Sequence, residues 1–434
     1  MRGAVQRIAL LGPLRLRDFR LLWTGMTVSL LGDGVFYVAI AWQVYQLSDS
    51  PTALSVVGLA MSLSQVVFLL LGGVASDRLD RRRVMLAADV LRAAVIGALG
   101  LLVLAGALTL WHVVVLGALY GIGAGFFAPA FDAIVPDLVP DGLLGHANAL
   151  DQILRPTALR LAGPALGGWL ITAWGTGGAF LLDGGSFLVS AVMLARMRPQ
   201  SSRAADGAPT STLREVREGF GFVRRHVWLW GTFLAATFAY LLFVGPSEVL
   251  VPFVVKHDLG GNARDLGLIF SVGGLGAVAG AFTVGQRGLP RRHVTFMYVA
   301  WSLATLAVAG YGLATRAWHL VVASLAFNAL EAAGTVVWAT TKHRLIPAAL
   351  LGRVSSFDWF ISIGLLPVSF ALTGPVAAAV GARATLIAAG VLGAVVTGGF
   401  LFVPGMRTIE RESPDQHAPS VGSVGSHAEG AAAP

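Results

Sequence analysis

The chain contains no cysteine, and only 12% of its 434 residues are charged. Without cysteine it has no disulfide framework, no thiol metal site and no redox clue to its compartment. Soluble globular proteins carry about 25% charged residues, whereas 56% of this chain is hydrophobic and its mean hydropathy is +0.74. These values exclude a soluble globular protein and indicate a protein that crosses a membrane many times.

Catalytic sequence motifs are also missing. No histidine pair stands at metal-ligand spacing, and neither Gly-x-Ser-x-Gly nor Gly-x-x-x-x-Gly-Lys occurs. The net charge is +8, but the arginines lie in short loops between apolar runs rather than on a soluble basic face, so nucleic acid is not an expected partner. We therefore expect no enzyme, no metal and no cofactor.

About twelve stretches are long and apolar enough to cross a bilayer, which takes roughly 20 residues per helix. Of the basic residues in loops and at span ends, only Lys256, Arg264, Arg316 and Arg383 lie opposite the N-terminus, while 24 others, including Lys342, lie on the N-terminal side. This asymmetry predicts that both termini are cytoplasmic in a multi-pass protein of the cell membrane. The expected spans are 21–47, 52–76, 84–109, 112–135, 147–174, 177–197, 228–255, 265–286, 294–315, 318–341, 355–379 and 383–403.

The two halves of the chain resemble each other. Residues 140–151 align without gaps on residues 347–358, with Leu144-Gly145 meeting Leu351-Gly352 and Asp151 meeting Asp358. A tandem repeat of six spans predicts two pseudo-symmetric bundles with a binding site near the membrane midplane between them. The expected division is an N-terminal six-helix bundle at 1–198, a cytoplasmic linker with an interfacial helix at 199–226, a C-terminal six-helix bundle at 227–405 and a disordered cytoplasmic tail at 406–434.

A charged loop joins the second and third spans, with the sequence Gly72-Gly-Val-Ala-Ser-Asp77-Arg-Leu-Asp80-Arg-Arg-Arg-Val84. Gly-x-x-x-Asp-Arg-x-x-Arg-Arg at this place resembles the signature loop of the major facilitator superfamily of transporters. Ala75 stands where that family usually has Leu, and Asp80 where it usually has Gly, so the family's tight turn is in question here. The resemblance implies an all-α integral membrane fold of twelve transmembrane helices in two six-helix bundles.

Two further segments are similar to exporters of this superfamily. Gly163-Pro164-Ala-Leu-Gly167-Gly168 resembles its antiporter motif, although Leu159 stands where an upstream glycine is expected. Residues 351–356 followed by Gly374-Pro375 resemble the subgroup of enterobactin exporters and macrolide efflux proteins. The resemblance implies proton-coupled efflux of an amphiphilic drug, macrolide-like compound or siderophore by a monomer in the lipid bilayer, with the proton gradient as energy source. An importer or lipid transporter of the same fold is the alternative.

The resemblance also implies which residues gate the transporter. Asp77 and Arg81, with Asp137, are expected to form a cytoplasmic latch, and a Gly-Pro kink in span five is expected to bend as the binding site changes sides. A packing kink without gating is the alternative. The expected gating residues are Gly73, Asp77, Arg78, Arg81, Asp137, Gly163, Pro164, Gly167 and Gly168.

Two acidic residues lie at membrane depths where charge is strongly disfavoured. Asp33 is about 18 Å into the first span and Glu331 about 20 Å into the tenth, both near the midplane. An ionisable residue at this depth is a functional candidate, so we expect Asp33 and Glu331 to bind the proton and substrate. The alternative for each is a carboxyl group hydrogen-bonded between helices for packing.

Polar and aromatic side chains at helical spacing share faces with these two residues or line neighbouring helices. The superfamily's first, fourth, seventh and tenth helices line its cavity, so the resemblance implies that these residues do the same here, with core packing as the alternative. The expected cavity-lining residues are Ser29, Phe36, Tyr37, Tyr120, Phe127, Phe131, Thr237, Tyr240, Asn328, Thr335 and Trp338.

Overall fold

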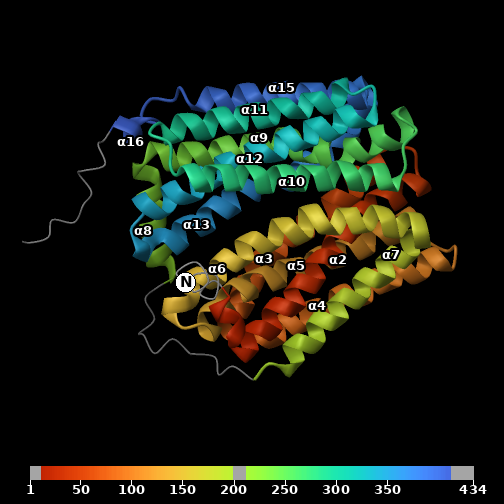
Figure 1. The fold of residues 1–434 in the computed structure, drawn as a ribbon, viewed down its shortest axis with the longest axis horizontal. Coiled ribbons are helices and arrows are strands. Elements are labelled where there is room, and N and C mark those ends of the chain that lie inside the picture. The colour runs from red at the N-terminus through yellow and green to blue at the C-terminus, as the bar shows by residue number, and fades with distance from the viewer. Residues whose placement is uncertain (1–10, 199–211, 412–434) are drawn as a thin grey trace, which may run out of the picture.

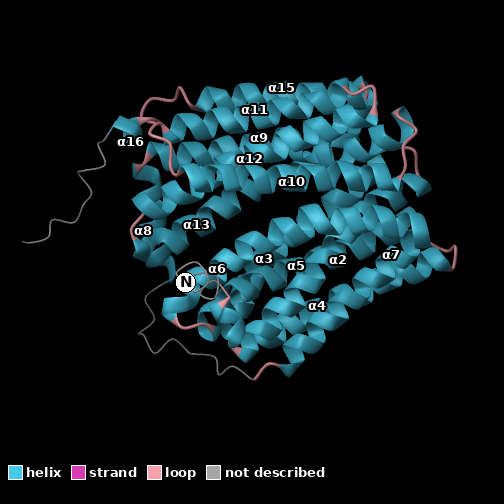
Figure 2. Ribbon diagram, in the orientation of Figure 1, coloured by secondary structure: helices cyan, strands magenta, loops and turns pink. Residues whose placement is uncertain are grey.

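The computed structural model describes residues 11–198 and 212–411, and within these ranges every regular element is a helix (Figure 2). Eleven helical segments are long and apolar enough to span a membrane. One of them, residues 142–196, contains two spans, because Gly175 adopts φ 72° and breaks the helix there. The described chain therefore has the twelve predicted spans, and the all-α membrane fold is confirmed.

The first half begins with a 3-10 turn and continues through five long helical segments. These are η1 (Gly12–Arg15), α2 (Arg17–Leu47), α3 (Pro51–Arg78), α4 (Arg81–Leu104), α5 (Leu110–Leu138), α6 (Asp141–Arg155), the π-helical η2 (Pro156–Ala162) and α7 (Gly163–Arg196).

The second half follows a short connecting helix, α8 (Thr212–Arg225). Its elements are α9 (Val227–Phe253), the π-helical η3 (Val254–Asp258), α10 (Ala263–Arg287), α11 (His293–Leu313), α12 (Ala317–Leu345), α13 (Ala348–Ile363), α14 (Leu366–Val380), α15 (Ala382–Phe400) and α16 (Thr408–Arg411). Figure 1 shows α2–α7 on one side and α9–α15 on the other.

The short loops divide between two ends of the molecule. We call the end with the loops at 79–80, 197–198, 288–292 and 346–347 the arginine-rich end, and the end with the loops at 48–50, 105–109, 259–262 and 314–316 the opposite end. The first described residues and α16 lie at the arginine-rich end (Figure 1). Both ends of the described chain therefore emerge on one side.

Asp80 stabilises the turn between α3 and α4, where the superfamily usually has a glycine. Its side chain accepts a hydrogen bond from the backbone N–H of Arg82 at 2.9 Å and caps α4. Its φ of −59° is open to any residue. An aspartate at a helix start satisfies a free backbone donor, so this turn does not require the glycine that the superfamily usually has.

The packed chain extends beyond the predicted start of the tail at residue 406. Met406 is fully buried, and the carboxylate of Glu410 accepts a hydrogen bond from the backbone N–H of Thr295 at 2.6 Å and another from its hydroxyl at 2.9 Å. These contacts hold residues 406–411 against α11 and the second half's core. The rest of the predicted tail, 412–434, and residues 199–211 of the linker lie outside the described residues.

Candidate functional site

Asp33 lies inside the first half, between α2 and α5. Its side chain is 7% exposed and accepts a hydrogen bond of 2.5 Å from the hydroxyl of Tyr120. The ring of Phe36, one turn further along α2, stacks on the ring of Tyr120 at 4.7 Å between centroids. Tyr37 projects from the same region and is 42% exposed. The rings of Tyr120 and Phe36 therefore lie next to the buried Asp33, and the accessible side chain of Tyr37 is close by.

More ionisable side chains surround Asp33 than the sequence analysis proposed. Asp89 and Arg92, one turn apart on α4, form a buried ion pair. Ser190 of α7 donates a hydrogen bond of 2.6 Å to Asp89. Asp183 of α7 is completely buried. We call Asp33, Asp89, Arg92, Tyr120 and Asp183 the buried polar cluster.

Asp183 is not among the predicted site residues, although it is, like Asp33, an ionisable residue within a membrane span. Asp183 lies in an apolar span, eight residues beyond the break at Gly175. An ionisable residue so far inside a span is a functional candidate in its own right. Membrane depth was therefore the sequence signal that could have found it.

Glu331 lies on α12 and contacts the first half of the molecule. Its carboxylate is 3.6 Å from the guanidinium of Arg160 on η2, and the hydroxyl of Thr335 donates to it at 3.1 Å. Arg160 is 52% exposed and Glu331 22% exposed. No ion pair or hydrogen bond joins Asp33 to Glu331 in the described chain. The structure thus gives these two carboxyl groups separate partners.

The predicted cavity-lining residues divide by exposure. Tyr37 and Thr335 are exposed, and Phe127, Tyr240 and Asn328 are half-buried. The others pack inside the bundles in this conformation: the hydroxyl of Thr237 donates to the Ile361 carbonyl at 2.9 Å, and the indole N–H of Trp338 donates to Asp358 at 3.0 Å. The buried members are Ser29, Phe36, Tyr120, Phe131, Thr237 and Trp338. Helical spacing in the sequence does not distinguish a residue that lines a cavity from one that packs against a neighbouring helix.

The predicted latch at the arginine-rich end has a different composition in the structure. Arg81 forms an ion pair with Asp137 of α5 and donates a hydrogen bond of 3.0 Å to the Ala133 carbonyl. Asp77 is exposed, has no ion pair among the described residues, and is followed by an equally exposed Arg78. The Arg81–Asp137 part of the prediction matches the contacts. The expected Asp77 contact is absent in this conformation.

The Gly-Pro segment of α7 packs directly on neighbouring backbone. A methyl group on Gly163 would lie 2.6 Å from Cα of Gly34, and one on Gly34 would lie 3.0 Å from Cδ of Pro164. Gly167 meets Val35 of α2. A methyl group on Gly168 would lie 3.1 Å from Cα of Arg264 in the second half. This segment therefore packs against α2 on one side and the other half of the molecule on another. The signature-loop glycine Gly73, in contrast, faces open space.

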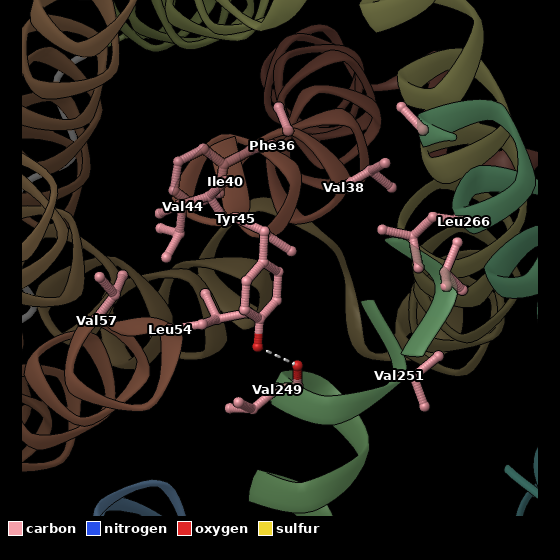
Figure 3. Packing of buried hydrophobic residues seen from close by; sticks show 14 of the residues in the cluster. Phe36, Val38, Ile40, Val44, Tyr45, Leu54, Val57, Val249, Val251 and Leu266 are labelled. Carbon is pink, nitrogen blue, oxygen red and sulfur yellow. Dashed lines mark hydrogen bonds between the residues drawn. The ribbon is translucent and has the colours of Figure 1, made fainter. Parts of the chain in front are cut away.

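Several interactions join the halves at the opposite end of the molecule. The hydroxyl of Tyr45 donates a hydrogen bond of 2.7 Å to the Val249 carbonyl among buried side chains of both halves (Figure 3). The ammonium group of Lys256 donates to the Tyr45 carbonyl, and His257 Nε2 lies 2.8 Å from the Asp49 carboxylate. The hydrogen bond from His257, with the nearby charge of Lys256, lowers the pKa of the Asp49 carboxyl below its usual range. We call Asp49, Lys256 and His257 the end latch.

Within residues 11–198 and 212–411, no three His, Cys, Asp or Glu side chains converge in an arrangement that suits a metal ion. The chemistry of the buried polar cluster and of Glu331 is that of carboxyl groups near hydroxyls and guanidinium groups. Such groups can bind protons and can contact polar parts of a solute.

The chain is similar to known membrane transport proteins. The sequence profile of a family described as "transmembrane secretion effector" matches residues 8–430. Macrolide efflux protein A of Streptococcus pyogenes is 23% identical over 378 residues, which cover 86% of this chain and 93% of that protein. Multidrug efflux pump Tap of Mycolicibacterium fortuitum is 28% identical over 426 residues, covering 93% and 98%.

The fold resembles that of a solved transporter structure. A bacterial homologue of the human lysosomal transporter Spinster, solved in an inward-facing and unoccupied conformation, superposes with a TM-score of 0.63. The match covers 92% of this chain and 99% of that one at 18% sequence identity. At this identity the likeness concerns the fold alone.

Proposed function

Since this chain belongs to the transmembrane secretion effector family of major facilitator transporters, we propose that it exports an amphiphilic small molecule in exchange for protons. It is a multi-pass membrane transporter and not an enzyme. Its substrate is a small molecule that meets the protein inside the bilayer. Proton exchange, the direction of transport and the substrate class are the parts that we propose.

The environment of Asp33 is the observation that carries the proton coupling. Asp33 is 7% exposed, and burial disfavours a charged carboxylate, although the hydrogen bond that it accepts from Tyr120 partly offsets this effect. When the halves rearrange and expose this group to water on the other side, the proton can leave. A cationic or polar group of the substrate nearby favours the ionised form, so proton and substrate compete. That competition is the basis of exchange.

Three observations support an amphiphilic substrate. The accessible side chains near the two carboxyl groups include Tyr37 and the half-buried Tyr240, which offer apolar ring surface with a polar tip. Arg160 and Glu331 add one charge of each sign. Two related proteins bear names of macrolide and multidrug efflux. A drug, a macrolide-like compound or a siderophore has this combination of apolar body and polar groups.

The test is transport by the full chain in proteoliposomes, with erythromycin, ethidium and a catecholate siderophore as probes. We expect a pH gradient to drive accumulation of at least one probe in the export direction. We call the highest concentration ratio that transport can reach the limiting accumulation. Each coupled proton contributes about 1.4 kcal/mol per pH unit, so Asp33→Asn lowers the limiting accumulation about tenfold for each pH unit of gradient.

Asp77→Asn is the comparison variant, because Asp77 is exposed and has no ion pair in the described chain. As an expected gating residue it can change the rate of transport, but the coupled protons set the limiting accumulation, which should stay the same. Unchanged pH-driven transport in Asp33→Asn contradicts the proposed coupling. Transport in the opposite direction under the same gradient supports an importer or lipid transporter instead.

A further inference from the structure

Asp183 is buried more deeply than Asp33 and, like it, has one hydrogen-bond partner among the described residues. Its side chain has no exposed surface, and it lies on the part of α7 that follows Gly175. One carboxyl oxygen accepts a hydrogen bond of 3.0 Å from the hydroxyl of Ser186. The other oxygen is buried and has no hydrogen-bond partner among the described residues. A carboxylate normally accepts several hydrogen bonds, so this environment suits the neutral acid.

The cation of the cluster is already engaged by another residue. Arg92 pairs with Asp89, and its guanidinium lies 4.2 Å from the ring centroid of Phe187 and 4.4 Å from that of Phe127. Its planar group is thus held between one carboxylate and two aromatic faces. No ion pair joins Arg92 to Asp183 in the described chain.

A count of charges follows from these contacts. Asp33 from α2 and Arg92 from α4 lie near Asp183, and Ser186 of α7 itself donates a hydrogen bond to it. One guanidinium balances Asp89 and leaves Asp33 and Asp183 without a counter-charge. Two uncompensated carboxylates side by side in a low-dielectric interior are strongly disfavoured. Both therefore hold protons in this conformation.

Asp183 and Asp33 are also mechanically linked. A methyl group on Gly32 would overlap Oδ1 of Asp183 and Oγ of Ser186, so the α2 backbone next to Asp33 rests directly on the Asp183 side chain. Any displacement of α2 against α7 changes the surroundings of both carboxyl groups together. Interacting titratable sites of this kind titrate in two steps that belong to the pair rather than to either residue.

We propose that Asp183 is a second proton site of the transport cycle, loaded together with Asp33, so that one cycle carries two protons. The transport role rests on the proposed exchange of substrate for protons. Both protons come from water on the side of higher proton concentration and leave to water on the other side. No other reactant is needed.

The direct test is infrared spectroscopy of the full chain in lipid at neutral pH, where a protonated carboxyl group has its own C=O absorption. We expect Asp183→Asn to remove one such absorption and Asp33→Asn to remove another. Asp77→Asn should remove none, because Asp77 is exposed and lies outside the buried polar cluster. A spectrum of Asp183→Asn that matches the wild type overturns the proposal.

A milder variant guards against misfolding. Ser186→Ala removes the hydrogen bond to Asp183 and leaves the carboxyl group in place. We expect its Asp183 absorption to move in frequency but to remain at neutral pH. An unmoved spectrum shows that the absorption does not belong to Asp183, which overturns the proposal in the same way.

Transport measurements separate this proposal from the proposed function. With the membrane potential held at zero, we expect Asp183→Asn to lower the limiting accumulation of a transported probe by about tenfold per pH unit. If wild-type transport ignores the pH gradient, the proposed exchange is wrong, while the infrared result still reports the Asp183 proton. If transport follows the gradient with the same limit in both proteins, the exchange stands and the second proton is wrong.

Discussion

The glycines at 163 and 73 belong to the two segments that resemble transporter motifs, yet their surroundings differ. Gly163 of α7 lies against Gly34 of α2, backbone to backbone. Gly73 lies near the end of α3, where a methyl group added to it would have no neighbour within 4 Å outside its own helix backbone. The sequence alone gives both residues the same chemistry. Their effect on stability depends on what stands beside them.

We therefore expect Gly163→Ala to destabilise the protein and Gly73→Ala to leave it nearly unchanged. The added methyl of Gly163→Ala would lie 2.6 Å from Cα of Gly34 and 2.7 Å from the Ala158 carbonyl oxygen. Overpacking of this kind costs about 1–3 kcal/mol, whereas an unobstructed substitution stays within about 0.5 kcal/mol. Thermal unfolding of the two purified variants measures this, and equal shifts in both would contradict the packing argument.

At the scale of the elements, the end latch joins the loop after α2 to η3 at the end of α9. Its members come from different halves, so it resists separation of the halves at the opposite end. Exposed ion pairs contribute little to overall stability. When two conformations have similar free energies, however, a small change in their free-energy difference is enough to shift their populations.

We expect acid to weaken the end latch. The pKa of Asp49 is lowered when the latch is formed, so its stabilising effect is complete above the usual aspartate pKa of about 4 and is lost as the pH falls through the lower latched value. Spin labels on Leu47→Cys and Leu259→Cys report the separation across the latch. They would be the only thiols, because the chain has no cysteine. The population of molecules in which the two labels are far apart, the long-distance population, should grow below about pH 4.

Asp49→Asn in the same labelled protein is the control for this experiment. It removes the titrating group, so the long-distance population should be raised at neutral pH and should no longer respond in this acid range. An acid response that survives the substitution would assign the effect to another group and contradict the role of Asp49.

At the scale of the whole molecule, the distribution of arginine predicts the orientation in the membrane. Arg78 and Arg81–Arg83 lie at the same end of the molecule as Arg291 and Arg292 in the second half. We propose that this arginine-rich end is cytoplasmic and that the end latch faces the outside.

Reporter fusions test the orientation in cells. Green fluorescent protein fused after Pro434 should fluoresce, because it folds in the cytoplasm, and alkaline phosphatase fused in the loop at 105–109 should be active, because it needs the oxidising exterior. Active phosphatase after Pro434 together with a dark fluorescent fusion would show that the orientation is the reverse.

The number of spans and the depth of Asp33 and Glu331 could be predicted from the sequence because hydropathy and position along a helix are local properties. The partners of these residues could not. Tyr120 reaches Asp33 from another helix, and Arg160 reaches Glu331 from the other half of the molecule. No local pattern records which faces of distant helices meet. Asp183 is different, because its position in the sixth span is a local property that the sequence already contains.

The sequence by itself determined an all-helical membrane protein with a twofold repeat and a resemblance to an exporter family. A bilayer requires long apolar helices whatever their neighbours are, and a repeated sequence requires a repeated bundle. Only the tertiary structure decided that Arg81 pairs with Asp137 rather than Asp77, that Phe36 and Trp338 are buried in this conformation, and that Arg92 is engaged by Asp89. Those outcomes depend on which side chains lie within a few ångströms of one another, and that distance is fixed only when the helices pack.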